Sequence, residues 1–208
     1  MLRIISGTHG GRLIESPPGQ ELRPMMDKVR AALFDMLWHF DALHGRVLDL
    51  YAGSGAVGLE ALSRGAEFAD FVEINPVSAR TIQRNLEALG LQSQGRVHLR
   101  SADDIIVNPS LLGHRGPYDL ISVTPPYEQV SYPGLSRAIA ESTLAGPGTV
   151  VVFEHPRELE MPDEIGPLGR LRDRHYGRTN LSIYEYPYEE RMGTEGTRGK
   201  LAGTHRSY

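Results

Sequence analysis

The chain has 208 residues, a formal net charge of −4 and 40% hydrophobic residues, which is enough for one α/β domain with short appendages. The net negative charge excludes a protein that coats nucleic acid indiscriminately, because such binding depends on neutralising phosphates. The absence of cysteine excludes disulfides, thiol nucleophiles and cysteine metal sites, and no apolar run reaches the roughly 20 residues that span a bilayer. We expect a cytoplasmic monomer with no metal and no membrane partner.

Two short extended runs open the chain, LRIIS and RLIES, on either side of a His-Gly-Gly turn. They predict a small β-hairpin extension over residues 1–26. The first thirty residues also carry a mild basic bias, which is a candidate nucleic-acid contact, although an ordinary solvated surface explains the same charges as well. The candidate contacts are Arg3, His9, Arg12, Arg23, Lys28 and Arg30.

Residues 27–187 carry the pattern of a single α/β domain. From Asp27 to Phe40 the apolar residues recur at three- and four-residue steps, which predicts an amphipathic helix. After Gly45, apolar strands alternate with helices, which indicates a mostly parallel sheet covered on both faces. The strands are RVLDLY, FADFVEI, RVHLR, YDLISV and TVVVFEH, and LRDRHYG with TNLSIYEYP predicts a closing antiparallel hairpin at one edge. Residues 188–208 lack hydrophobic periodicity and predict a disordered tail.

A glycine-rich turn follows the first strand of this domain. Gly53, Gly55 and Gly58 satisfy the G-x-G-x-x-G spacing, which several nucleotide-type cofactors share. Asp49 would repel a pyrophosphate at the helix N-terminus but would favour the cationic S-adenosylmethionine. Glu73 ends the next strand, where a carboxylate can accept hydrogen bonds from the ribose of either NAD or S-adenosylmethionine. The candidate cofactor contacts are Asp49, Tyr51, Ala52, Gly53, Ser54, Gly55, Glu73, Ile74, Ala102 and Asp103, the last as an acceptor for the adenine amino group.

Thr124, Pro125, Pro126 and Tyr127 stand at the carboxyl end of the fourth strand, where open α/β sheets bind ligands. A rigid loop entry would also explain two prolines. An exocyclic amine on a base is a poor nucleophile and needs acceptors for its protons. The side chain at position 124 and the carbonyl of Pro125 can supply them, and Tyr127 offers a ring for base stacking. These four residues are the candidate catalytic site.

The chain resembles the RsmD family of bacterial 16S rRNA guanine-N2 methyltransferases. The likeness covers roughly residues 1–187 and rests on RIISGTHGGRLI, Leu22-Arg23-Pro24, Asp27-Lys28-Val29-Arg30, VLDLYAGSGAVGLEALSRGA, FVEIN and the Pro-Pro-Tyr segment. It implies a seven-stranded class I methyltransferase sheet in the order 3-2-1-4-5-7-6, with S-adenosylmethionine as donor and S-adenosylhomocysteine as product. It also implies methylation of the small ribosomal subunit at guanine 966 in the usual rRNA numbering. The hairpin would then grip RNA, with Arg12 and Arg23 on phosphates.

The chain departs from the family pattern chiefly at Thr124, where the family has Asp. Smaller departures are Met25, Met26, Ala31 and Ala102. A hydroxyl is a weaker acceptor than a carboxylate, so we expect a slower enzyme. Two other hypotheses stay open: a non-catalytic RNA-binding or ribosome-assembly factor that keeps the fold, and an NAD-linked oxidoreductase, which rests on the glycine spacing alone.

Overall fold

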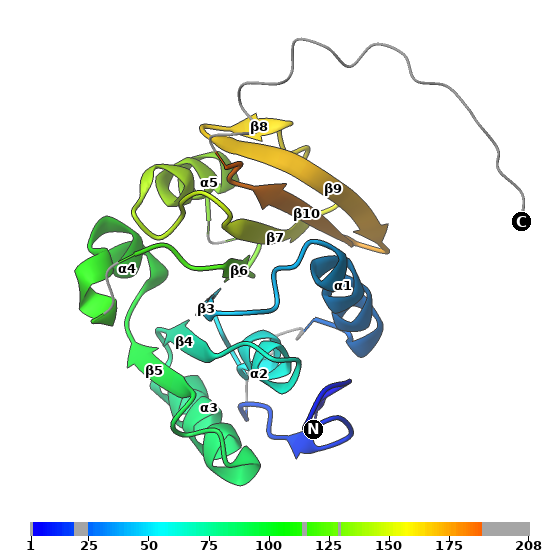
Figure 1. The fold of residues 1–208 in the computed structure, drawn as a ribbon, viewed down its shortest axis with the longest axis vertical. Coiled ribbons are helices and arrows are strands. Elements are labelled where there is room, and N and C mark those ends of the chain that lie inside the picture. Colours follow the sequence, from blue (N-terminus) through cyan, green and yellow to red (C-terminus); the bar gives the residue numbers. More distant parts are fainter. Residues whose placement is uncertain (1, 19–24, 114–115, 129, 189–208) are drawn as a thin grey trace, which may run out of the picture.

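A computed structural model describes residues 2–18, 25–113, 116–128 and 130–188. Its centre is one sheet in the order β5-β4-β3-β6-β7-β10-β9-β8 (Figure 1). The strands are β3 (Arg46–Leu50), β4 (Phe68–Glu73), β5 (Gly95–Leu99), β6 (Leu120–Val123), β7 (Val150–Pro156), β8 (Glu164–Ile165), β9 (Leu168–Tyr176) and β10 (Thr179–Glu185). The first five of these run parallel, and β10, β9 and β8 add to the edge of β7 in antiparallel fashion.

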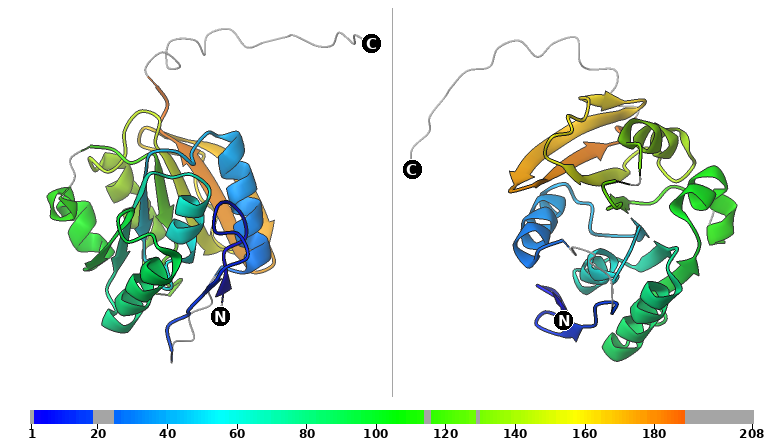
Figure 2. Two further views of the ribbon diagram at one scale, coloured as in Figure 1. Left: turned by 60° about the horizontal axis from the view of Figure 1, so that its bottom comes forward. Right: turned by 180° about the vertical axis from the view of Figure 1, so that it is seen from behind.

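Helices cover both faces of the sheet (Figures 1 and 2). The helices are α1 (Asp27–His39), α2 (Ala56–Ser63), α3 (Pro76–Leu89), α4 (Ala102–Val107), η1 (Pro109–Leu112) and α5 (Tyr132–Glu141). One hydrophobic cluster joins α1, α2 and α3 to strand residues such as Val47, and a second joins α4, η1 and α5 to residues such as Leu48. Neighbouring strand residues therefore serve opposite cores, because successive side chains point to opposite faces.

The N-terminal hairpin is fixed to the body of the protein. Its strands β1 (Leu2–Arg3) and β2 (Leu13–Ile14) are only two residues long, and Ile4 and Ile14 are buried in the core beside α2. The buried carboxylate of Glu60 on α2 accepts the backbone N–H groups of Ile5 at 2.7 Å and Ser6 at 3.0 Å. The hairpin is therefore held in a defined orientation.

The observed strand order confirms the predicted fold class. If β3 to β7 are numbered 1 to 5, β9 is numbered 6 and β10 is numbered 7, the order across the sheet is 3-2-1-4-5-7-6, as expected. The short strand β8 is an additional edge strand that was not predicted. The disordered tail was expected at residues 188–208, and residues 189–208 lie outside the described residues. The predicted RNA contact Arg23 also lies outside them. Within the described part of the chain, no helix has both the length and the apolar character that crossing a membrane requires.

Candidate active site

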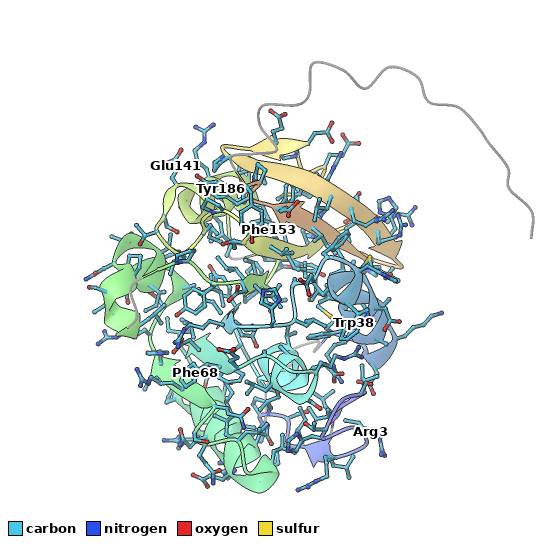
Figure 3. All side chains as sticks on the ribbon, viewed as in Figure 1. Arg3, Trp38, Phe68, Glu141, Phe153 and Tyr186 are labelled. Atoms are coloured by element: carbon cyan, nitrogen blue, oxygen red, sulfur yellow. The ribbon has the colours of Figure 1, made fainter. Side chains whose placement is uncertain are left out.

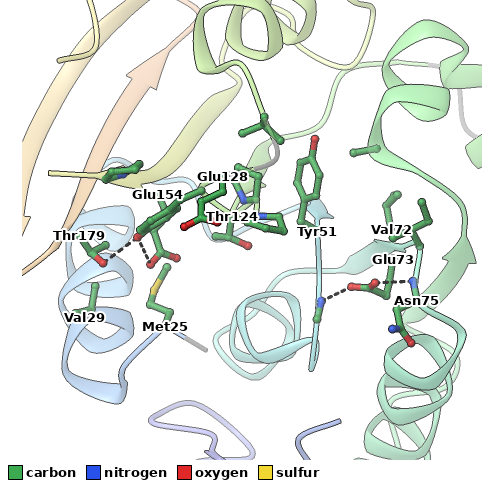
Figure 4. A pocket seen from close by; sticks show the side chains of 18 of the residues that line it. Met25, Val29, Tyr51, Val72, Glu73, Asn75, Thr124, Glu128, Glu154 and Thr179 are labelled. Carbon is green, nitrogen blue, oxygen red and sulfur yellow. Dashed lines mark hydrogen bonds between the residues drawn. The ribbon is translucent and has the colours of Figure 1, made fainter. Parts of the chain in front are cut away.

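A cavity of about 1040 Å³ lies at the carboxyl ends of the parallel strands (Figure 4). Its lining combines the predicted cofactor and reaction residues with residues of α1 and of the β9–β10 hairpin. Of the predicted residues, the lining includes Tyr51, Gly53, Glu73, Ile74, Ala102, Asp103, Thr124, Pro125, Pro126 and Tyr127. The structure therefore brings six of the ten predicted cofactor residues and the whole predicted reaction segment into one cavity.

Strand register arranges four of the lining residues in a row. Leu50 on β3 pairs with Val72 on β4 and with Val123 on β6, and Val123 pairs with Phe153 on β7. The residues that follow these positions are Glu73, Tyr51, Thr124 and Glu154, which cross the sheet edge in that order. Figure 4 shows Glu73 and Glu154 at opposite ends of this row, with Tyr51 and Thr124 between them.

Glu73 holds the glycine-rich turn against the adjoining strand. Its Oε2 accepts the N–H of Gly53 at 2.8 Å, and its Oε1 accepts the N–H of Asn75 at 2.7 Å. The side chain of Asn75 in turn caps α3 by accepting the N–H of Val77 at 2.8 Å. Each carboxylate oxygen keeps a further lone pair, so Glu73 can still accept ribose hydroxyls.

Asp49 does not line the cavity. It is buried under the turn, where its Oδ2 accepts the N–H of Gly58 at 3.0 Å. Burial raises the pKa of Asp49 to about 7, and the Gly58 N–H and the Ser122 hydroxyl offset part of that rise. Asp49 therefore occupies a donor of the first turn of α2, which a pyrophosphate would otherwise use, and its direct contact with a cofactor stays a prediction.

Three other predicted residues of the glycine-rich turn do not line the cavity. Ala52, Ser54 and Gly55 are absent from the cavity lining within the described residues, and the carbonyl of Ser54 accepts a bond from Asn85 at 3.1 Å. Gly55 takes φ +79°, a left-handed conformation that favours glycine. Their direct contact with a cofactor stays a prediction.

Tyr51 and Asp103 form the side of the cavity between the turn and α4. Tyr51 has φ +62°, which is rare for a residue with a large side chain and is a mark of functional sites. Burial raises the pKa of Tyr51 to about 12, and the charge of Asp103 adds to the effect. Ala102 and Asp103 begin α4, which Ser101 caps by accepting the N–H of Asp104 at 3.0 Å.

The predicted reaction segment is fixed at both ends. The N–H of Thr124 donates to the carbonyl of Leu50 at 3.5 Å, and Pro125 is buried. The hydroxyl of Tyr127 lies 2.9 Å from Thr179 Oγ1 and donates to Glu154 Oε1 at 3.2 Å. The side chain of Tyr127 is therefore anchored at its hydroxyl.

Glu154 is the site residue that the sequence reasoning missed. Its strand, TVVVFEH, carries an acidic residue near its carboxyl end, as the strands of Asp49 and Glu73 do, and that position was the available signal. Burial raises the pKa of Glu154 to about 7, although the hydrogen bond from Tyr127 lowers it in part.

The predicted RNA contacts lie in different environments. Arg3, Arg12 and Lys28 are exposed; Arg3 projects from the hairpin in Figure 3 and donates to the carbonyl of Gly11 at 2.8 Å. Arg12 donates to the carbonyl of Ala88 at 2.7 Å.

The other two described candidates, His9 and Arg30, are less exposed than these three. His9 Nε2 lies 3.1 Å from the carbonyl of Leu89. Arg30 is fully buried, with Nη2 3.0 Å from Asp27 and Nε 3.9 Å from Glu60. The expected RNA contact of Arg30 is therefore corrected to a structural ion pair.

The residues present fit S-adenosylmethionine better than a dinucleotide. Asp49 takes up the N–H of Gly58, and the side of the cavity next to the turn carries the carboxylates of Glu73 and Asp103. This donor and acceptor set suits a ribose, an adenine amine and cationic groups, and it opposes a pyrophosphate.

A family model and two curated relatives indicate the same family for this chain. The family model described as "Conserved hypothetical protein 95" matches residues 2–185. The putative rRNA methyltransferase YlbH of Bacillus subtilis is 36% identical over 187 residues, which is 88% of this chain and 98% of that protein. Ribosomal RNA small subunit methyltransferase D of Haemophilus influenzae is 34% identical over 128 residues, which is 61% of this chain and 64% of that protein.

A solved structure agrees with these relatives. The putative methyltransferase yhhF from Escherichia coli superposes with a TM-score of 0.76 at 26% identity and covers 89% of this chain and 98% of that one. Together with the match over residues 2–185, this shows that the chain belongs to the family described as conserved hypothetical protein 95, the RsmD-like methyltransferases.

Proposed function

We propose that this protein transfers a methyl group from S-adenosylmethionine to the exocyclic N2 of a guanine in 16S rRNA of the small ribosomal subunit. One observation carries the proposal: Thr124, at the head of the Pro-Pro-Tyr segment, stands in the same row of strand ends as Glu73 and faces the same cavity. Relatives named as small-subunit rRNA methyltransferases support the substrate class. Membership of a methyltransferase family supports methyl transfer over an NAD-linked oxidation.

The chain's own residues hold and align the two reactants. Glu73 and Asp103 line the cavity, and in this proposal they accept hydrogen bonds from the hydroxyls and the amine of the cofactor, which supplies an electrophilic methyl carbon when it is bound. In the same proposal, the carbonyl of Pro125 and the hydroxyl of Thr124 accept hydrogen bonds from the amino group of the base. Alignment of this kind is worth roughly 7–11 kcal/mol, and the restricted φ of proline keeps the carbonyl in place.

A second candidate is a ribosome-assembly factor that keeps the fold without the activity. The specific observation in its favour is Thr124, because a hydroxyl accepts a proton more weakly than a carboxylate does. Thr124→Asp separates the two functions. If the protein is an enzyme, the variant should raise an already measurable methylation rate by about tenfold, whereas a gain from no detectable rate supports the assembly factor.

Labelled methyl transfer tests the proposal directly. Small subunits from cells without the enzyme should accept label from S-adenosylmethionine, and the Pro125→Ala variant should lose transfer while it still binds S-adenosylhomocysteine. Absence of transfer by the wild-type protein to subunits and to naked rRNA would contradict the proposal.

A further inference from the structure

Glu154 stands at the end of the cavity opposite Glu73. It follows Phe153, the register partner of Val123, and so lies beside Thr124 on the neighbouring strand, where strands are about 4.8 Å apart. Its Oε1 accepts the hydroxyl of Tyr127 at 3.2 Å. Figure 4 shows Glu154 on the side of the cavity near Thr179 and α1. A carboxylate is therefore held next to the position where the family pattern would place one.

Within the described part of the fold, the Glu154 carboxylate makes one hydrogen bond, in which its Oε1 accepts the hydroxyl of Tyr127. In the part of the chain that the structure describes, Glu154 has no ion-pair partner, and its Oε2 accepts no hydrogen bond. A partly buried acid without a countercharge lowers the stability of the folded state when it is ionised. Acids of this kind in a cleft mark functional sites, and this one lines the proposed reaction cavity. The unused acceptor capacity of Glu154 is available to a ligand in the cavity.

Guanine presents the matching chemistry. Its Watson–Crick edge carries two donors side by side, N1–H and one N–H of the N2 amine, which the two oxygens of a carboxylate can accept together. Adenine has an acceptor at N1, which a carboxylate repels. An enzyme that acts on a base reads this edge once the base has left its stack.

We infer that Glu154 is the residue that selects guanine, by accepting N1–H and one N2–H of the target base. The inference rests on the proposed function. The second N2–H is left for the carbonyl of Pro125 or the hydroxyl of Thr124, so all three donors of the edge find acceptors. Tyr127 and Thr179 hold the carboxylate in position, since the Tyr127 hydroxyl bridges the two side chains.

The test compares Glu154→Gln with the wild-type protein on two substrates. Glutamine keeps an oxygen that can accept the Tyr127 hydroxyl, but it places an amide N–H where guanine needs an acceptor. The substrates are small subunits reconstituted on ligated rRNA that carries either guanine or 2-aminopurine at the mapped target. 2-Aminopurine keeps the N2 amine but has an acceptor at N1. Glu141→Gln, an exposed glutamate at the end of α5, is the matched control.

Glu154→Gln should lower kcat/KM with guanine by about 100-fold, as expected when a charged hydrogen-bonding partner is replaced by a mismatched one. With 2-aminopurine the loss should be much smaller, because the new amide can donate to N1. The control should behave as the wild type on both substrates. Guanine activity within threefold of wild type would overturn the inference, and so would equal losses on both substrates, which would reduce Glu154 to a support for Tyr127. A wild-type protein that methylates neither substrate would instead refute the proposed function.

Discussion

Gly58 allows α2 to pack directly against the sheet below the cofactor turn. A Cβ at this position would lie 2.3 Å from Cε1 and 2.9 Å from Cζ of Phe71, whose ring is fully buried on β4. Replacing glycine by alanine within a helix gains about 1 kcal/mol from the backbone. Overpacking a filled core costs about 1–3 kcal/mol, and a contact this short belongs at the upper end of that range. Gly58→Ala should therefore lower the free energy of unfolding by about 1–2 kcal/mol.

The same substitution elsewhere provides the control. At Gly134 in α5 an added Cβ meets Ser131 Oγ at 3.6 Å, an ordinary contact, so Gly134→Ala should raise stability by up to about 1 kcal/mol. For a chain of this length, Gly58→Ala should lower the Tm by about 2–8 °C in thermal unfolding. It should also weaken binding of S-adenosylhomocysteine in calorimetry, because the turn must shift with the helix. A Gly58→Ala protein as stable as wild type would refute the packing argument.

Two further predictions concern buried charges. The folded pKa of Glu154 is about 7 against an ordinary value of 4.5, so the unfolded chain loses this proton first, and Glu154 lowers stability as pH rises from about 4.5 to 7. Glu154→Gln should therefore gain stability relative to wild type across that window in urea unfolding, and a constant difference would contradict the assigned burial. Arg30→Ala empties a fully buried site and removes one of the two cations beside the buried Glu60, which keeps Arg64 at 2.7 Å, so the substitution should cost about 2–5 kcal/mol. The exposed Arg12→Ala should cost under about 1 kcal/mol and weaken RNA binding. If Arg30→Ala and Arg12→Ala lost similarly small amounts of stability, Arg30 would not have the structural role assigned to it.

The parallel sheet and the cavity edge could be predicted because they depend on local patterns, whereas the strand order was implied by the family resemblance. Alternating apolar strands and helices fix the parallel sheet, and the glycine turn and the Pro-Pro-Tyr segment mark strand ends that meet at one edge. Arg30 was misread from charge alone. Its spacing from Phe34 and Leu37 places it on the apolar stripe of α1, and that periodicity outweighs the general rule that arginine is exposed.

Glu154 could not be ranked as a site residue without the register of β6 against β7. Many strands carry an acid near their carboxyl end, and only the pairing of Val123 with Phe153 places this one beside Thr124. The hairpin strands were predicted too long for a related reason. The chain leaves the β1–β2 ladder after two residue pairs, and Ile5 and Ser6 donate their N–H groups to Glu60 on α2.

Mapping the modified base decides whether the protein methylates a guanine at N2. Small subunits from cells that lack the enzyme are treated with this protein and S-adenosylmethionine, and their rRNA is digested for mass spectrometry of nucleosides and fragments. We predict one new N2-methylguanosine in 16S rRNA, which does not form with Pro125→Ala. A methyl group on adenine or cytosine, or no methyl group at all, would contradict it.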